Sequence, residues 1–298
     1  MLFDSKDIYI NIFVDEKKKV NNKWNYIGML IVKEKFEEEI ISFLKKTQEE
    51  ENISEMKYKD VKINSGKYRV AMKWIDFICE GFLSHSDCKF FINILGIDIE
   101  KLNYSFFGAE NESEKYYHPY NRFFRTVIKS SWSHFFKNQN VNYVIRRVFH
   151  DTEGVLETQQ PYFKIQLKKA FEEDNSLKIM DKEIKFVNSN PDEEKYYKNY
   201  SYFIELIDLI LGVVSFAYDY KYDYDKVNAQ KLEARKNMAL KLNEILHQIF
   251  EKKAYLKNFD VSFFPTNEYG KNVPAENLFF KRKPVIFGQK NLDEYINT

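Results

Sequence analysis

The sequence predicts a single α/β domain in which a mixed β-sheet is covered by helices on both faces. Two runs rich in β-branched and aromatic residues, 8–14 (IYINIFV) and 24–32 (WNYIGMLIV), flank a polar KKKVNNK turn and predict an antiparallel hairpin. Further strand-like runs then alternate with stretches whose apolar residues recur at helical spacing. Strands mixed with helices along one chain are typical of the α/β class.

The remaining strands are expected where short apolar runs follow polar segments. They lie at 89–97 (KFFINILGI), at 142–149 (NYVIRRVF) and, as a short strand, at 184–187. With the hairpin, these runs predict a mixed five-stranded sheet.

Helical spacing begins directly after the hairpin, where Phe36, Ile40 and Leu44 recur in the stretch 34–48. The same criterion predicts helices at 67–83, 114–137, 159–171, 200–218 and 226–256. We expect residues 1–220 to form the α/β domain. Residues 221–298 are expected to form a long C-terminal helical extension and tail packed on the same domain, with its helix as a lid or a dimer surface.

Composition limits the partners and the compartment. The 298 residues suffice for a large core, and 44% apolar with 31% charged residues indicates a folded soluble protein. A net charge of +1 gives no global attraction to a polyanion or a membrane, so nucleic-acid contact requires a local patch. Two cysteines, an early charged N-terminus and no apolar run near the roughly 18 residues of a membrane helix predict a cytoplasmic protein without a membrane partner.

Several common enzyme classes lack their motifs. The nine glycines are too dispersed to form GxGxxG or GxxxxGK[ST], which disfavours dinucleotide enzymes and P-loop ATPases. The chain contains no GxSxG, and none of its five histidines begins HExxH. Serine hydrolases and zincin metalloproteases are therefore disfavoured too.

Four acidic residues stand out because each interrupts an otherwise uniform element. Asp15 and Asp151 each close a predicted strand, where a turn residue or a helix cap is the plain alternative. Asp208 lies in the apolar helix ELIDLILGVV and needs a cation, a hydrogen-bond network or an opening to solvent. Glu55 lies in the charged link SEMKYKD, where a solvated acid is the plain alternative.

Strand-end carboxylates joined by one from a helix can hold two hard divalent cations, which prefer oxygen ligands. Such a pair of ions activates the attacking water and stabilises the leaving oxygen of a phosphodiester. The chemistry requires neither cysteine nor histidine.

The order of these acids resembles the bacterial domain-of-unknown-function 3800 family. That family's pattern is a strand ending in DES, an ExK element, a strand-end Asp and a late LQxADxxAG helix. The matching segments here are FVDEK, SEMKYKD, RVFHDTEG and IELIDLILGVV, between about residues 7 and 218. The resemblance implies a ribonuclease H-like fold and a hydrolase dependent on Mg²⁺ or Mn²⁺, with metal ligands Asp15, Glu55, Asp151 and Asp208.

The chain departs from that pattern at three positions. Lys17 replaces the serine after DE, Glu205 replaces the glutamine of the late helix, and Ile207 replaces the small residue before Asp208. All four acids are retained, so these departures concern residues that orient the site.

Further residues are candidates for a function in the site, and each also has a structural explanation. Lys57 shares a face with Glu55 if the segment is extended, so it could hold the scissile phosphate or neutralise the acids. His150 could transfer protons, but adjacent strand residues point to opposite faces. The remaining candidates are a Cys79, His85 and Cys88 metal cluster, basic patches at 146–147 and 281–283, and an aromatic stacking surface at 116–124. The cluster lacks a fourth partner, which disfavours it, and a solvated surface and core packing are the commoner explanations of the basic patches and of the aromatic stretch.

Two functions follow. In the first, Asp15, Glu55, Asp151 and Asp208, with Lys57, form a two-metal nuclease site for RNA, DNA or a hybrid, in an effector of a mobile-element or anti-phage system. In the second, the fold is a non-catalytic binding or assembly subunit, with structural carboxylates. It would then associate with a second copy or a partner protein through the 226–256 helix.

Overall fold

The sheet grows outward from the hairpin of β1 (Asp7–Val20) and β2 (Trp24–Lys33). In this computed structural model the order is β5-β4-β1-β2-β3-β7, with β6 also paired to β4. The antiparallel pairs are β1 with β2 and β2 with β3, and all other pairs are parallel. The later strands are β3 (Phe90–Asp98), β4 (Asn142–Asp151), β5 (Leu177–Ile179), β6 (Ile184–Val187) and β7 (Phe259–Phe264).

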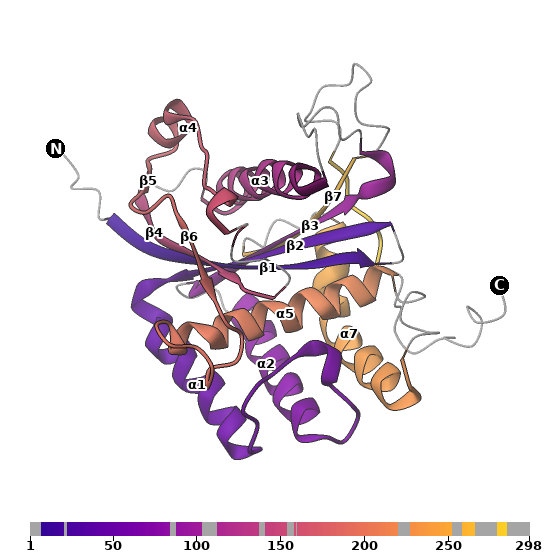
Figure 1. Cartoon of the computed structure of the whole chain (residues 1–298). Coiled ribbons are helices and arrows are strands. Elements are labelled where there is room, and N and C mark those ends of the chain that lie inside the picture. Colours follow the sequence, from indigo (N-terminus) through magenta and orange to yellow (C-terminus); the bar gives the residue numbers. More distant parts are fainter. Residues whose placement is uncertain are drawn as a thin grey trace.

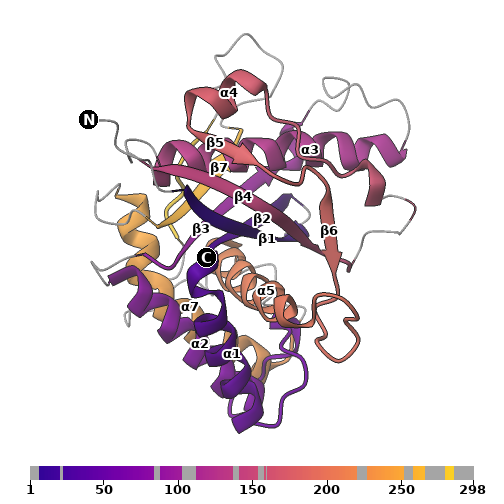
Figure 2. The same cartoon turned by 90° about the vertical axis from the view of Figure 1, so that its left-hand side faces the viewer.

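The structure describes residues 7–20, 23–83, 88–102, 112–136, 141–153, 158, 160–219, 227–251, 258–265 and 279–284. Within them the chain is an α/β fold with a mixed sheet between helices, as predicted (Figure 1). α3 (Glu112–Ser131) and a following π-helical turn cover one face. α1 (Glu37–Glu50), α2 (Gly66–Leu83), α5 (Lys198–Asp219) and α7 (Ala229–Phe250) cover the other (Figures 1 and 2).

The predicted count of five strands is wrong, because the sheet has seven strands within the described residues. β5 has only three residues, and it is recognisable only by its pairing with β4. β7 lies in the segment that we expected to be a helical extension and tail, and it pairs with β3. The predicted polar turn after β1 is also wrong in part, because Lys17 and Val20 still pair with β2.

The expected helix at 159–171 does not form. Phe163 and Ile165 are buried while Lys164 and Gln166 are exposed, which is the alternation of an extended segment. Lys164 accordingly forms a bridge with Glu183, and among the described residues of this stretch only a 3-10 turn (Gln160–Tyr162) and the start of the short α4 (Lys169–Asp174) are helical.

α5 is the central helix of the core. Every residue from 201 to 218 is buried except Asp208. The helix is long and apolar enough to cross a membrane, but 89% of its apolar window is buried inside the protein. This is the arrangement of a core helix in a soluble protein.

α5 approaches the sheet closely at Gly28, which pairs with Asp15 across β1 and β2. A Cβ atom at Gly28 would lie 3.1 Å from Ile207 Cδ1 and 3.2 Å from Leu211 Cδ1. The missing side chain therefore lets α5 lie against the strand pair that carries Asp15.

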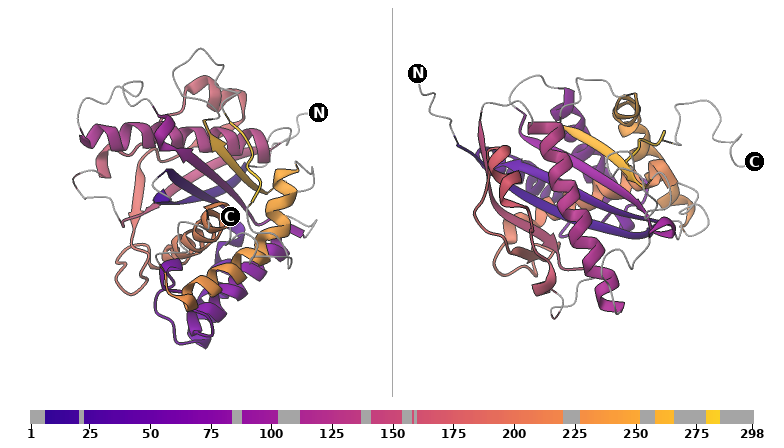
Figure 3. Two further views of the ribbon diagram at one scale, coloured as in Figure 1. Left: turned by 90° about the vertical axis from the view of Figure 1, so that its right-hand side faces the viewer. Right: turned by 90° about the horizontal axis from the view of Figure 1, so that it is seen from above.

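α7 packs against α2 and α5, and its apolar face is used within the chain. Met238, Leu242 and Leu246 are fully buried, whereas Leu240 is 37% exposed. The ends of the predicted 226–256 helix lie partly outside the described residues. Figure 3 shows α7 beside α2 on the face of the sheet opposite α3.

We expect Leu242→Ala to lower the free energy of unfolding by about 2–5 kcal/mol, because it leaves a cavity in the core that α7 shares with α2 and α5. Leu240→Ala, on the exposed side of the same helix, is the matched control and should change stability by less than about 0.5 kcal/mol. Chemical denaturation of both variants measures the difference. Equal effects would contradict the packing of α7 described here.

Candidate functional site

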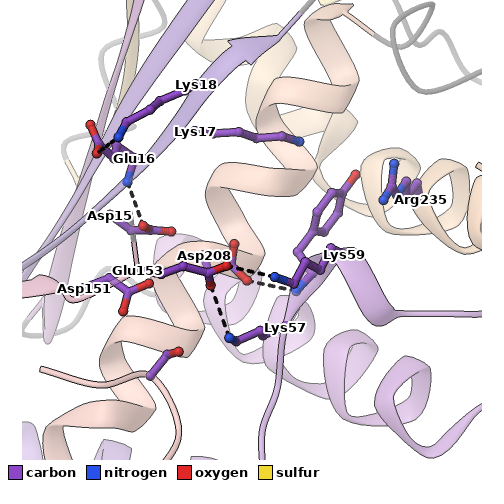
Figure 4. A pocket seen from close by; sticks show the side chains of 12 residues that line it. Asp15, Glu16, Lys17, Lys18, Lys57, Lys59, Asp151, Glu153, Asp208 and Arg235 are labelled. Carbon is purple, nitrogen blue, oxygen red and sulfur yellow. Dashed lines mark hydrogen bonds and ion pairs between the residues drawn. The ribbon is translucent and has the colours of Figure 1, made fainter. Parts of the chain in front are cut away.

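A pocket of about 330 Å³ opens where β1, β4, the 57–59 segment, α5 and α7 meet (Figure 4). Its acidic side chains are Asp15, Glu16, Asp151, Glu153 and Asp208. Its basic side chains are Lys17, Lys18, Lys57, Lys59 and Arg235. The five acids balance the five bases, so the pocket is neutral in formal charge but strongly polar.

Two parallel strands place Asp15 and Asp151 together. Val14 lies opposite His150, so the next residues, Asp15 and Asp151, point to the same side of the sheet. Two positions earlier on this face, Phe13 and Phe149 stack with ring centroids 5.2 Å apart. Asp15 is 8% exposed and lies within β1, not at its end as predicted, whereas Asp151 is 6% exposed and ends β4.

α5 brings the third carboxylate to this pair from the facing layer. Asp208 Oδ2 accepts a hydrogen bond from the backbone N–H of Tyr58 at 2.9 Å. Burial raises the pKa of Asp208, against the lowering effects of that hydrogen bond and of Lys17. Asp208 thus holds the backbone at Tyr58 and also lines the pocket.

The three aspartates destabilise one another as anions. Burial, followed by the charges of Asp208 and Asp151, raises the pKa of Asp15 well above its ordinary value. Burial also raises the pKa of Asp151 to about 6, and its Oδ1 is buried without a hydrogen-bond partner among the described residues. A cation bound in this pocket would offset both the cost of burying the charged carboxylates and their mutual repulsion.

The donor set fits Mg²⁺ or Mn²⁺, because it consists of carboxylate oxygens. Within the described ranges, however, no three histidine, cysteine or acidic side chains converge closely enough to form a ready-made metal centre. The aspartates would therefore have to turn toward one another to share an ion.

Glu55 and Lys57 form a pair at the edge of this pocket. Lys57 lines the pocket, and its Nζ lies 3.1 Å from Glu55 Oε1 and 3.1 Å from Glu153 Oε2. Burial lowers the pKa of Lys57, but the hydrogen bonds to these two acids outweigh it, and the pKa is raised. Lys57 is thus a charged group, and Glu55 lies beside the pocket, where its carboxylate also accepts from Ser189 Oγ at 3.3 Å.

The segment that carries these residues is docked on a polar strip of α5. Glu205 Oε1 accepts the Met56 N–H at 2.6 Å, one helical turn before Asp208 accepts the Tyr58 N–H. One turn after Asp208, Gly212 lies under the Tyr58 ring, and a Cβ atom there would be 2.2 Å from Tyr58 Cγ. We call Glu205, Asp208 and Gly212 the docking strip.

Sequence reasoning missed the function of Glu205 as an anchor. Its two oxygens accept from Met56 N and from Gln48 Nε2, the latter at 2.7 Å. Burial raises the pKa of Glu205 well above its ordinary value. The signal available in the sequence was a second acid three residues before Asp208 in an apolar helix.

The other candidates lie away from the pocket. His150 is buried on the opposite face of β4, against Tyr120, Phe163 and Phe186. Its Nδ1 lies 2.6 Å from the Asp151 carbonyl oxygen. It is therefore a core residue in this structure.

The cysteine cluster and the aromatic surface are not formed by the residues described. Cys79 and Cys88 pack against different cores on opposite faces of the sheet, and His85 lies outside the described residues. Tyr120, Phe123 and Phe124 are buried in the α3 core, and the side chain of Tyr116 lies outside the described residues.

Three residues of the basic patches are engaged in ion pairs. Arg146 pairs with Glu34, Lys281 with Asp260, and Arg282 Nη2 lies 2.9 Å from Asp219 Oδ1. Arg282 also lies over the Trp24 ring at 4.5 Å, so this C-terminal segment is held against the ends of α5 and β2.

No protein-family model matches the chain, and a search of curated proteins finds no match either.

We expect Asp151→Asn to stabilise the protein at neutral pH. The folded pKa of about 6 exceeds the ordinary 3.8, so the folded state binds more protons between these values and stability falls as pH rises through the window. Above pH 6 the ionised carboxylate costs up to about 3 kcal/mol, which the amide removes. Thermal melts at pH 4 and pH 7.5 should show a gain only at the higher pH, with the exposed Asp192→Asn as control. A loss of stability at pH 7.5 would contradict this.

Gly212→Ala should displace the Tyr58 ring and destabilise the protein by about 1–3 kcal/mol. In a Tyr58→Ala background the added methyl group has space, so the same change should cost less than about 0.5 kcal/mol. A double-mutant cycle of unfolding free energies measures the coupling. Additive effects would show that the position of the Tyr58 ring does not depend on the absence of a side chain at Gly212.

Proposed function

We propose that the chain is a hydrolase of phosphodiester bonds in nucleic acid, dependent on Mg²⁺ or Mn²⁺, with a ribonuclease H-like fold. The observation that carries this proposal is the convergence of Asp15, Asp151 and Asp208, which are distant in sequence, on one pocket. The sheet supports the fold assignment, since three antiparallel strands are followed by β4, which returns parallel to β1.

Asp15, Asp151 and Asp208 would hold the ions, and Glu55, which pairs with the pocket residue Lys57, would complete the set through a change of partner. Two bound ions would activate the attacking water and stabilise the leaving oxygen. Lys57, kept charged by Glu55 and Glu153, presents a positive charge to the phosphate. The docking strip keeps Lys57 and Asp208 in a fixed relation, because both belong to the same hydrogen-bonded contact.

A cytoplasmic effector of a mobile-element or anti-phage system is the setting that the family resemblance suggests, with RNA, DNA or a hybrid as substrate. The alternative is a binding or assembly subunit with structural carboxylates. The Asp208 bond to Tyr58 favours that alternative. The burial of the apolar face of α7 does not, because that face was its means of association.

Substitution of Asp15 and Asp208 by asparagine distinguishes the hydrolase from the assembly subunit. Asn at 208 can still accept the Tyr58 N–H through its amide oxygen but loses the charge that an ion requires. We expect Asp15→Asn and Asp208→Asn to abolish Mn²⁺ binding in calorimetric titrations. We expect them to reduce cleavage of labelled single strands, duplexes and hybrids by more than about 100-fold. Asp192→Asn, on the exposed surface, should leave both unchanged.

Unchanged cleavage in the Asp15→Asn and Asp208→Asn variants would refute the hydrolase. A folded wild type that binds neither Mg²⁺ nor Mn²⁺ would favour the assembly subunit.

A further inference from the structure

Four of the five cations of the pocket fall into two groups, and the fifth, Lys18, pairs with Glu16 at 2.9 Å. Lys57 and Lys59 both bond Glu153, at 3.1 and 2.9 Å. Lys17 Nζ and the Arg235 guanidinium instead each lie 4.8 Å from the centroid of the Tyr58 ring. In Figure 4 Asp15 and Asp151 lie on one side of the pocket and Arg235 on the other, with Lys17 extending from β1 across it.

This second group is held in place from three elements. Lys17 Nζ donates to Ser215 Oγ on α5 at 2.9 Å. Arg235 comes from α7 and is only 5% exposed, yet it lines the pocket. Tyr58, between them, is fixed by the docking strip through its backbone N–H and its ring. Two positive charges are thereby presented to the cavity with little freedom to move.

We propose that Lys17, Tyr58 and Arg235 form a subsite for a backbone phosphate of nucleic acid, next to the position that the carboxylates prepare for the scissile phosphate. The proposal deepens the proposed function and rests on it. A guanidinium and an ammonium group are the usual side-chain partners of a phosphate, and the guanidinium can donate two parallel hydrogen bonds. The Tyr58 ring keeps both groups oriented through cation–π contacts.

The charge distribution favours a polynucleotide over an isolated phosphate. Asp15 and Asp151 lie at one end of the pocket and Arg235 at the other, with Asp208 beside Tyr58 between them, so successive phosphates of one strand meet different surroundings. The whole chain carries only +1, so affinity for a polyanion must come from such a local group.

The test uses the full chain carrying Asp15→Asn, which prevents cleavage, and measures binding by fluorescence anisotropy over a range of salt concentrations. The probes are short fluorescein-labelled single strands of DNA and RNA. Lys17→Ser and Arg235→Gln should each weaken binding about five- to tenfold and reduce the slope of log K against log salt by about 0.7. Arg235→Lys should keep the slope and lose part of the affinity, and Lys236→Gln, the neighbouring residue on α7, should change neither.

Circular dichroism melts confirm that each variant is folded, and Lys17→Ser provides a test independent of the buried Arg235. Unchanged slopes in Lys17→Ser and Arg235→Gln would overturn the subsite, and so would a failure of the Asp15→Asn chain without them to bind the probes. Neither outcome would contradict cleavage by the wild type. If the wild type failed to cleave but the slopes of log K against log salt decreased as expected, the hydrolase proposal would be refuted and the phosphate subsite would be supported.

Discussion

The docking of residues 55–58 on α5 is the contact on which the pocket depends. Glu205 and Asp208 accept two backbone N–H groups of that segment, and Gly212 accommodates the Tyr58 ring. These backbone donors are buried, so their loss would cost the full desolvation penalty of the unpaired groups. The same contact places Lys57 at the rim and Tyr58 inside the cavity, so one helical strip supports both ends of the site.

The buried carboxylates of the pocket repel one another, and the rest of the fold must offset this unfavourable energy. Burial and mutual charge raise the pKa of Asp15 and Asp151, while Lys17 acts in the opposite sense on Asp208. Carboxylates crowded in this way are typical of positions retained for function at the expense of stability. The large apolar core around α5 makes such a cost tolerable, because the fold is stabilised by contacts independent of the site.

The C-terminal part of the chain contributes to the fold and to the pocket. β7 extends the sheet beside β3, and α7 buries its apolar face against α2 and α5. α7 also supplies Arg235, the only pocket residue among those described that follows α5 in the chain. This helix therefore has a function inside the protein, and the lid or dimer surface suggested by its length and amphipathic pattern stays a prediction.

The sequence by itself determined the α/β class, the first four strands and the three aspartates, because alternation, helical spacing and an acid in an apolar helix are local signals. It predicted too few strands, since β5 is defined by its pairing alone, and a helix at 159–171 where burial alternates. Only the tertiary structure decided that Glu205 anchors Met56 and that Lys17 and Arg235 share one aromatic ring. These are contacts between residues far apart in the chain, and their partners are chosen by packing, which no local pattern records.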